Sequence, residues 1–269
     1  MRDTDTPTTN TTQRKRLGRV VRVCVLGAAV VWAATIVIAN SRNAEYDWFK
    51  NTYGPNRHSE HAEEWIIRDF FHDQRGGIFL DVGSYDYKRF SNTYYLEQEL
   101  GWSGVAVDAQ QEFAAGYAQY RPRTKFFSFF VSDRSDALES LFVPSGNRLV
   151  ASSNKSFSDR YDTSGQERTV STITLNDLLP RAGVTRVDFL SMDIELAEPK
   201  ALAGFDLARY RPRLAVVEAH PDVRQQIVDY FADRGYRVVA RYLRADAHNL
   251  WFAPPDSALP PGVQIADEH

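Results

Sequence analysis

Acidic residues close two apolar segments, and this spacing suits ligand binding at the edge of a sheet. Asp81 lies within the run IFLDV, and Asp108 ends the later run GVAVD. Both runs are almost entirely apolar, which is typical of parallel strands that are buried on two faces. Ligands of open α/β sheets bind outside the carboxyl ends of such strands. The two carboxylates are therefore predicted to lie at one ligand site.

The loop after the first segment, GSYDY, indicates which ligand that is. It lacks the pattern G-x-G-x-x-G, and an acidic residue here would repel a pyrophosphate, which argues against an NAD-dependent oxidoreductase. A ligand that carries an amino group, a sulfonium and ribose hydroxyls fits better, and S-adenosylmethionine is such a ligand. Asp108 is placed to accept hydrogen bonds from the ribose hydroxyls. The alternative, that both aspartates only cap loops, stays open.

Four segments of the chain resemble one known family. FLDVGSYD, FSNTYYLEQELGWSGVAVDA, VDFLSMDIELAEPKALAGFD and RPRLAVVEAH occur in this order and resemble FkbM-type S-adenosylmethionine-dependent methyltransferases. The resemblance implies an α/β, Rossmann-like class I methyltransferase sheet, mostly parallel with an antiparallel hairpin at its edge. It also implies a set of cofactor-binding residues: Asp81, Gly83, Ser84, Asp86, Asp108 and Asp133.

Two residues depart from the family pattern. Tyr87 replaces a glycine that is usual after the second acid of the first loop, and Leu196 replaces a small residue in the DIE-x-AE segment. A bulky side chain where backbone approaches a ligand would alter or occlude the pocket. These departures favour the alternative of an inactive protein.

A second group of ionisable residues follows the strands expected at 186–192 and 213–217. Asp193, Glu195, Glu218 and His220 should meet in one cleft, because both strands end at the same sheet edge. His220 suits a general base at neutral pH, and the acids could orient it or hold a divalent cation. These four are the predicted catalytic residues.

The alternative for this second group is structural. Glu195 and Glu198 would begin a helix, where acids are favoured, and His220 would cap a strand. Elsewhere, His58, His61 and His72 lack the spacing of metal ligands, so no metal site is predicted from them.

Hydrophobic patterns predict the elements that position these residues. An irregular stretch at 137–172 is expected to contain a hairpin and is the candidate substrate lid. The remaining predicted elements are strands at 77–82, 104–107, 125–131, 186–192, 213–217, 236–243 and 249–253, with helices at 59–72, 92–100, 111–120, 175–182 and 222–234.

The N-terminal part has a different composition. Residues 1–19 form a polar and basic tail, and 20–40 form an apolar segment long enough for a transmembrane helix. A cleaved signal peptide is the alternative. Basic residues before the segment place the N-terminus in the cytoplasm, with the protein a single-pass membrane protein. A stem and helix at 41–75, the methyltransferase domain at 76–253 and a disordered, Pro-rich tail at 254–269 complete the predicted organisation.

Composition limits the function further. A net charge of −3 gives no support for nucleic acid as a partner, and the single cysteine, Cys24, excludes an intrachain disulfide. We expect a membrane-anchored S-adenosylmethionine-dependent methyltransferase. Its expected substrate is a hydroxyl-bearing small molecule or glycan, and the methylated oxygen is a hydroxyl of a glycan, a glycolipid or a polyketide-like molecule. The alternative is an inactive, membrane-tethered protein that uses the same fold as an interaction or trafficking module.

Overall fold

The computed structural model describes residues 44–257. The chain divides into Met1–Glu45 and Tyr46–His269, and the described residues lie almost entirely in the second unit. Within residues 44–257 no helix is long and apolar enough to cross a membrane. The predicted transmembrane segment 20–40 and most of the predicted tail lie outside the described residues.

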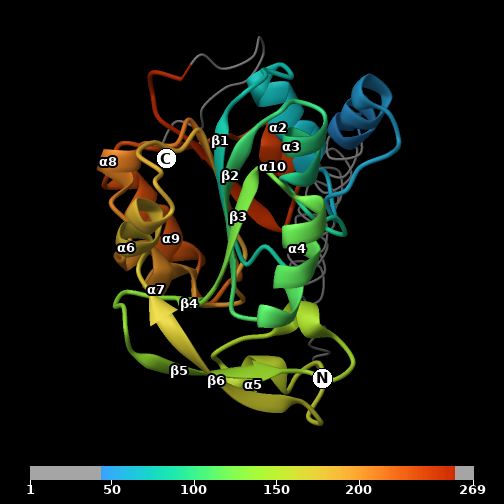
Figure 1. Ribbon diagram of the computed structural model, residues 1–269. Helices are drawn as coiled ribbons and strands as arrows, with labels where there is room; N and C mark the ends of the chain where they lie inside the picture. Colours follow the sequence, from blue (N-terminus) through green and yellow to red (C-terminus); the bar gives the residue numbers. More distant parts are fainter. Residues whose placement is uncertain (1–43, 258–269) are drawn as a thin grey trace, which may run out of the picture. The chain divides into compact units, whose positions relative to one another are not determined.

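A seven-stranded sheet in the order β3-β2-β1-β7-β8-β10-β9 forms the centre of the domain (Figure 1). Its first five strands are parallel to their neighbours, whereas β10 runs antiparallel to both β8 and β9. This arrangement confirms the predicted Rossmann-like sheet with an antiparallel edge hairpin. The strands are β1 Ile78–Val82, β2 Ser103–Asp108, β3 Thr124–Ser128, β7 Phe189–Met192, β8 Leu214–Glu218, β9 Arg237–Val238 and β10 Asn249–Ala253.

Both faces of this sheet are buried, which explains the continuous apolar runs. Side chains alternate along β1, so that Leu80 and Val82 pack into one hydrophobic cluster and Phe79 packs into the other. Figure 1 shows α6, α7, α8 and α9 on one side of the sheet and α2, α3, α4 and α10 on the other. These helices are α2 Glu63–Phe71, α3 Tyr94–Gln98, α4 Ala114–Tyr120, α6 Leu175–Arg181, α7 Glu198–Ala203, α8 Leu207–Tyr210, α9 Arg224–Ala232 and α10 Tyr242–Ala245.

The irregular stretch after the third strand contains the predicted hairpin. β5 Leu138–Val143 pairs antiparallel with β6 Gln166–Ile173, and α5 Lys155–Ser158 lies between them in the sequence. The strand predicted at 125–131 is wrong as one unit, because β3 ends at Ser128. The amide of Phe129 then donates to the backbone carbonyl oxygen of Asp108. After it, β4 Phe130–Val131 pairs with β6 in a separate three-stranded sheet.

The C-terminal hairpin is also shorter than predicted. Only Arg237–Val238 pairs with β10, and the rest of the stretch expected as a strand at 236–243 turns into α10. Tyr242 begins this helix with its ring buried against Trp251, at 5.7 Å between ring centroids. Packing of this aromatic side chain overrides the local strand pattern.

A buried ion pair fixes the loop that follows β1. Arg121 is 1% exposed and donates through Nε to Glu97, at 2.5 Å. Its other guanidinium nitrogens donate to the carbonyl oxygens of Tyr87 and Thr93, at 2.8 and 3.2 Å. The guanidinium of Arg121 therefore links α3, α4 and the loop. Each of its three nitrogens has a hydrogen-bond acceptor, which offsets the cost of burying the charge.

A close backbone contact brings β1 and β7 together at their carboxyl ends. Gly83 has a φ of +80°, and a Cβ atom placed on it would lie 1.7 Å from the carbonyl oxygen of Asp193. The amide of Asp193 donates to the carbonyl oxygen of Val82, at 2.9 Å. Only glycine permits both this backbone conformation and this contact.

Substitution of Gly83 by alanine should therefore destabilise the fold more than a positive φ alone would. Gly235→Ala is the matched control, because Gly235 has a φ of +76° and nothing lies within 4 Å of its added Cβ. We expect Gly235→Ala to lower the free energy of unfolding by about 1–2 kcal/mol. Gly83→Ala should lose about 1–3 kcal/mol more from the clash, measured by urea denaturation. Equal losses would contradict the close contact.

Candidate active site

A cavity of about 420 Å³ opens at the carboxyl ends of β1, β2, β7 and β8. Gly83, Tyr85 and Asp108 line one part of it, and Glu195 and His220 line another. The 137–172 insertion contributes a further part of the wall through Leu141, Asn147, Leu149, Val150, Ala151 and Tyr161. The insertion therefore borders the site, as predicted, and its action as a lid stays a prediction.

Asp108 ends β2 and lies in the cavity wall. Its Oδ1 accepts the amide of Gln110 at 2.8 Å, and its Oδ2 accepts the amide of Tyr85 at 2.9 Å. Burial raises the pKa of Asp108 to about 6, although these two hydrogen bonds lower it. Each oxygen keeps a lone pair after these bonds, so the carboxylate can accept two further hydrogen bonds from a ligand.

Asp81 is buried and is not in the cavity wall. Its side chain is 4% exposed, and its Oδ2 accepts the hydroxyl of Thr93 at 2.8 Å. Burial raises its pKa, whereas Thr93 and the nearby Arg121 lower it. In this structure Asp81 fixes the start of α3, next to the loop that borders the cavity.

Of the other residues predicted to bind the cofactor, some lie at the cavity and some lie away from it. Gly83 lines the cavity, and Ser84 is buried beside it with a hydroxyl that has no hydrogen-bond partner. Asp86 accepts the amides of Lys88 and Arg89 in a turn outside the cavity wall. Asp133 is exposed, accepts the hydroxyl of Ser132 and also lies outside the wall. The structure therefore brings Gly83 and Asp108 to the cavity and leaves Asp86 and Asp133 away from it.

Tyr87 does not occlude the cavity. Its ring stacks on Tyr120 of α4, at 4.7 Å between ring centroids, and lies against Gly116. Gly116 has no side chain, and a Cβ atom there would lie 2.5 Å from the tyrosine ring. Leu196 has a φ of +78° and is likewise not part of the cavity wall. Neither residue lines this cavity, and an effect of either on cofactor binding stays a prediction.

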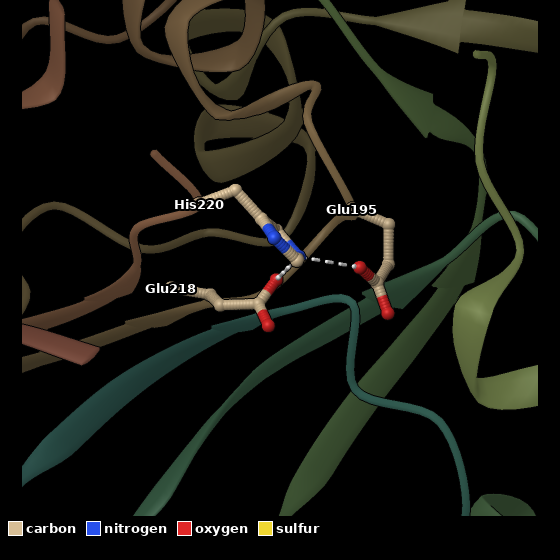
Figure 2. Close-up of side chains that lie close together, drawn as sticks. All are labelled: Glu195, Glu218 and His220. Carbon is tan, nitrogen blue, oxygen red and sulfur yellow. Dashed lines mark hydrogen bonds and ion pairs between the residues drawn. The ribbon is translucent and has the colours of Figure 1, made fainter. Parts of the chain in front are cut away.

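Glu195, Glu218 and His220 form a compact cluster at the ends of β7 and β8. Figure 2 shows the imidazole of His220 between the two carboxylates. Its Nε2 is 3.2 Å from Oε2 of Glu195 and 3.3 Å from Oε2 of Glu218. The first contact is a hydrogen bond, whereas the second is an ion-pair distance without hydrogen-bond geometry.

The charges in this cluster perturb one another. The carboxylates of Glu218 and Glu195 raise the pKa of His220 to about 9, although burial lowers it. Burial and the charge of Glu218 raise the pKa of Glu195 to about 8. Burial would raise the pKa of Glu218 too, but His220 and Asp193 outweigh it and the pKa is lowered. His220 is therefore an imidazolium at neutral pH, which differs from the neutral base expected from the sequence.

Asp193 and Glu198 lie next to this cluster. Asp193 lines the cavity and is accessible through it, yet the surrounding protein and the neighbouring carboxylates raise its pKa well above the usual range. Glu198 begins α7, as the structural alternative predicted, and its Oε1 accepts the amide of Ile194 at 3.0 Å. Burial raises the pKa of Glu198 to about 7.

Several residues of the cavity wall were not singled out from the sequence. The rings of His61 and His248 stack at 4.4 Å between centroids, although His61 precedes α2 and His248 precedes β10. Asn92 donates to the hydroxyl of Ser191 on β7, at 3.0 Å. Tyr161 lies in the SFSDRYDTS segment, where the loop-rich composition was the available signal. The histidine pair depends on tertiary contact, so no local pattern could identify it.

Comparisons with known proteins agree with this architecture. The family model described as "Methyltransferase FkbM domain" matches residues 81–238, more than half of the chain. No curated protein matches the chain.

Two of the solved structures that match the chain are methyltransferases. A TehB-like SAM-dependent methyltransferase from Corynebacterium glutamicum has 14% sequence identity and a TM-score of 0.42, with 80% of this chain and 98% of that chain covered. The precorrin-6y C5,15-methyltransferase from Geobacter metallireducens has 11% identity and a TM-score of 0.38, with 65% and 70% covered. On the family match, which spans the strand ends that form the cavity, this chain belongs to the FkbM family of S-adenosylmethionine-dependent methyltransferases.

Proposed function

We propose that this protein transfers the methyl group of S-adenosylmethionine to a hydroxyl oxygen of an uncharged acceptor, such as a glycan, a glycolipid or a polyketide-like molecule. One observation carries the proposal. A single cavity joins Asp108, which suits a ribose, to Glu195 and His220, which can exchange a proton. Cofactor and acceptor can therefore meet without crossing a protein wall.

The residues at the Asp108 part of the cavity fit the cofactor. Asp108 keeps free acceptor capacity for ribose hydroxyls, and Phe129, Phe130 and Val150 offer apolar surface for an adenine ring. The buried hydroxyl of Ser84 has no partner in the protein. When bound, S-adenosylmethionine supplies an electrophilic methyl group. The chain's own residues then need only hold it, exclude water and manage the proton of the acceptor.

The Glu195 and His220 part of the cavity suits the acceptor. Glu195 is 8% exposed, hydrogen-bonded to His220, and has a pKa raised to about 8, so its carboxylate form, which exists in equilibrium near neutral pH, can take up a hydroxyl proton. Tyr161 of the insertion stands in the same wall and is 52% exposed. An aromatic ring in such a position offers an apolar surface to a sugar ring.

The charge of the cavity favours an uncharged acceptor. Among the described residues that line it there is no lysine or arginine. The ionisable groups of the wall are histidines and carboxylic acids, namely Glu60, His61, Glu63, Asp108, Asp193, Glu195, Glu218, His220 and His248. A phosphate or carboxylate on the acceptor would meet repulsion there.

We further propose that the segment 20–40 anchors the protein in a membrane with the N-terminus in the cytoplasm. The support is its apolar length and the basic residues that precede it. The sequence argument for the inactive, membrane-tethered alternative is weakened, because neither Tyr87 nor Leu196 lies in the cavity wall. A calorimetric titration with the cofactor separates an active from an inactive site.

The first prediction concerns the cofactor site. The full-length protein should bind S-adenosylmethionine with micromolar affinity by calorimetry. Asp108→Asn should weaken binding about 10-fold to 100-fold, because charge-assisted hydrogen bonds to the ribose are lost. Asp133→Asn is the matched control and should leave affinity unchanged, because Asp133 is exposed and outside the wall. A comparable loss in both variants would refute the placement of the ribose at Asp108.

The second prediction concerns pH. Because the pKa of Asp108 is raised to about 6, the ionised carboxylate dominates above pH 6 and is progressively lost below it. S-adenosylmethionine affinity should therefore fall as the pH is lowered from 7.5 to 5, and it should be level at higher pH. The same titration with Asp108→Asn should show a flatter profile. A drop of equal size in that variant would assign the pH dependence to another group.

The third prediction concerns the acceptor. Release of S-adenosylhomocysteine should be stimulated by members of a panel of neutral glycosides, and the phosphorylated counterparts should be poorer acceptors. With an active acceptor, Glu195→Gln should lower kcat about 100-fold or more while cofactor affinity stays unchanged. Glu60→Gln, at another carboxylate of the same wall, is the control and should have a much smaller effect. If Glu195→Gln turned over normally, Glu195 would have no part in proton transfer.

A further inference from the structure

Three carboxylates converge beside the cavity from three different elements. Asp193 follows β7, Glu198 begins α7 and Glu218 ends β8. Each offers a carboxylate oxygen, and these three oxygens all lie within 4.8 Å of one another. Within residues 44–257 no lysine or arginine forms an ion pair with any of them. His220 offsets part of the charge of Glu218, at 3.3 Å, but one imidazolium cannot balance three carboxylates.

Glu198 shows that this group is incomplete. Its side chain is fully buried, at 0% exposure, and Oε1 accepts the amide of Ile194. Its second oxygen, Oε2, has no hydrogen-bond partner. A carboxylate oxygen that has lost water and gained no donor is costly, so a native structure ordinarily supplies a partner for it.

The neighbouring group already contains a positively charged side chain. Glu195, Glu218 and His220 also have donor atoms within 4.8 Å of one another, but the imidazole already lies between the carboxylates (Figure 2). A proton on His220 neutralises part of their charge, and Nε2 donates to Glu195. Among the residues that the structure describes, two buried carboxylate oxygens have no hydrogen-bond partner, Oε2 of Glu198 and Oε2 of Glu218. Both residues belong to the group with Asp193, so that group is where a ligand is missing.

The spacing and chemistry of that group fit a hard divalent cation. Carboxylate oxygens bind Mg²⁺ at about 2.1 Å and Ca²⁺ at about 2.4 Å, so two ligands of one ion lie at most about 4.2–4.8 Å apart. The three carboxylate oxygens lie within 4.8 Å of one another and meet the upper end of this range. The set contains only oxygen donors, which favours Mg²⁺, Mn²⁺ or Ca²⁺ over zinc or copper.

We propose that Asp193, Glu198 and Glu218 bind one divalent cation of the Mg²⁺, Mn²⁺ or Ca²⁺ class at the junction of β7, α7 and β8. The ion supplies the partner that Oε2 of Glu198 lacks, and it offsets the repulsion of three carboxylates. Asp193 and Glu218 also line the cavity, so the ion stands beside the acceptor part of the site. Open coordination positions there suit a hydroxyl oxygen of the acceptor.

The test is titration of Mn²⁺ into the full-length protein after EDTA treatment and dialysis, followed by electron paramagnetic resonance of the free ion. We expect one Mn²⁺ per chain with submillimolar affinity, and Mg²⁺ or Ca²⁺ should compete for the same site. Glu198→Gln should weaken binding at least 10-fold. Glu63→Gln is the matched control and should bind normally, since Glu63 is a buried glutamate of the same cavity outside the group.

The outcomes are distinguishable from a failure of the proposed reaction, because the titration uses neither cofactor nor acceptor. Circular dichroism checks the fold of each variant, and Asp193→Asn replaces Glu198→Gln if that variant does not fold. Absence of Mn²⁺ binding by the folded wild-type protein at millimolar concentrations would overturn the proposal. Binding of equal strength in the wild type and in a folded variant of the group would overturn it as well.

Discussion

The contact between Gly83 and Asp193 is the constraint on which the site depends. The neighbouring strands β1 and β7 are paired up to Val82 and Met192. The next residues, Gly83 and Asp193, are in close backbone contact. Because Gly83 has no side chain, the loop after β1 can lie directly against the end of β7. The groups that follow β2 and the groups that follow β7 and β8 then share one cavity. A larger residue at this point would force the two halves apart.

Electrostatics divide this cavity into two parts. At Asp108, two backbone amides hold a single carboxylate, and burial raises its pKa only to about 6, so it is ionised at neutral pH. At the ends of β7 and β8, four carboxylates share one imidazole, and burial together with mutual repulsion raises the pKa of Asp193, Glu195 and Glu198. The first part suits stable binding of hydroxyls. The second part suits proton exchange and cation binding, because its groups change protonation near neutral pH.

The sequence predicts the sheet well because its signals are local. Runs such as IFLDV and DFLSM are apolar on both faces, and in an α/β fold this pattern has few other structural meanings. It also predicts that Asp108, Asp193, Glu195, Glu218 and His220 share one edge, because strand direction decides this. The structure places all five in the cavity wall.

What the sequence did not reveal depends on tertiary contact. Asp81 and Asp133 follow the family pattern, yet neither lies in the cavity wall. The carboxylate of Asp81 accepts a hydrogen bond from Thr93, and that of Asp133 accepts one from Ser132. Tyr87 was expected to fill the pocket, because the sequence does not show that Gly116 leaves room for its ring. The charge state of His220 likewise depends on two glutamates, one of them 25 residues away along the chain.

The central claim is that one cavity holds the cofactor by Asp108 and directs its reactive end toward Glu195 and His220. A crystal structure of the complex with S-adenosylhomocysteine tests this most directly. The account predicts ribose hydroxyls within hydrogen-bond distance of the Asp108 carboxylate and the sulfur facing the Glu195 and His220 cluster. An adenosine bound away from Asp108, or a sulfur that faces away from the cluster, would contradict it.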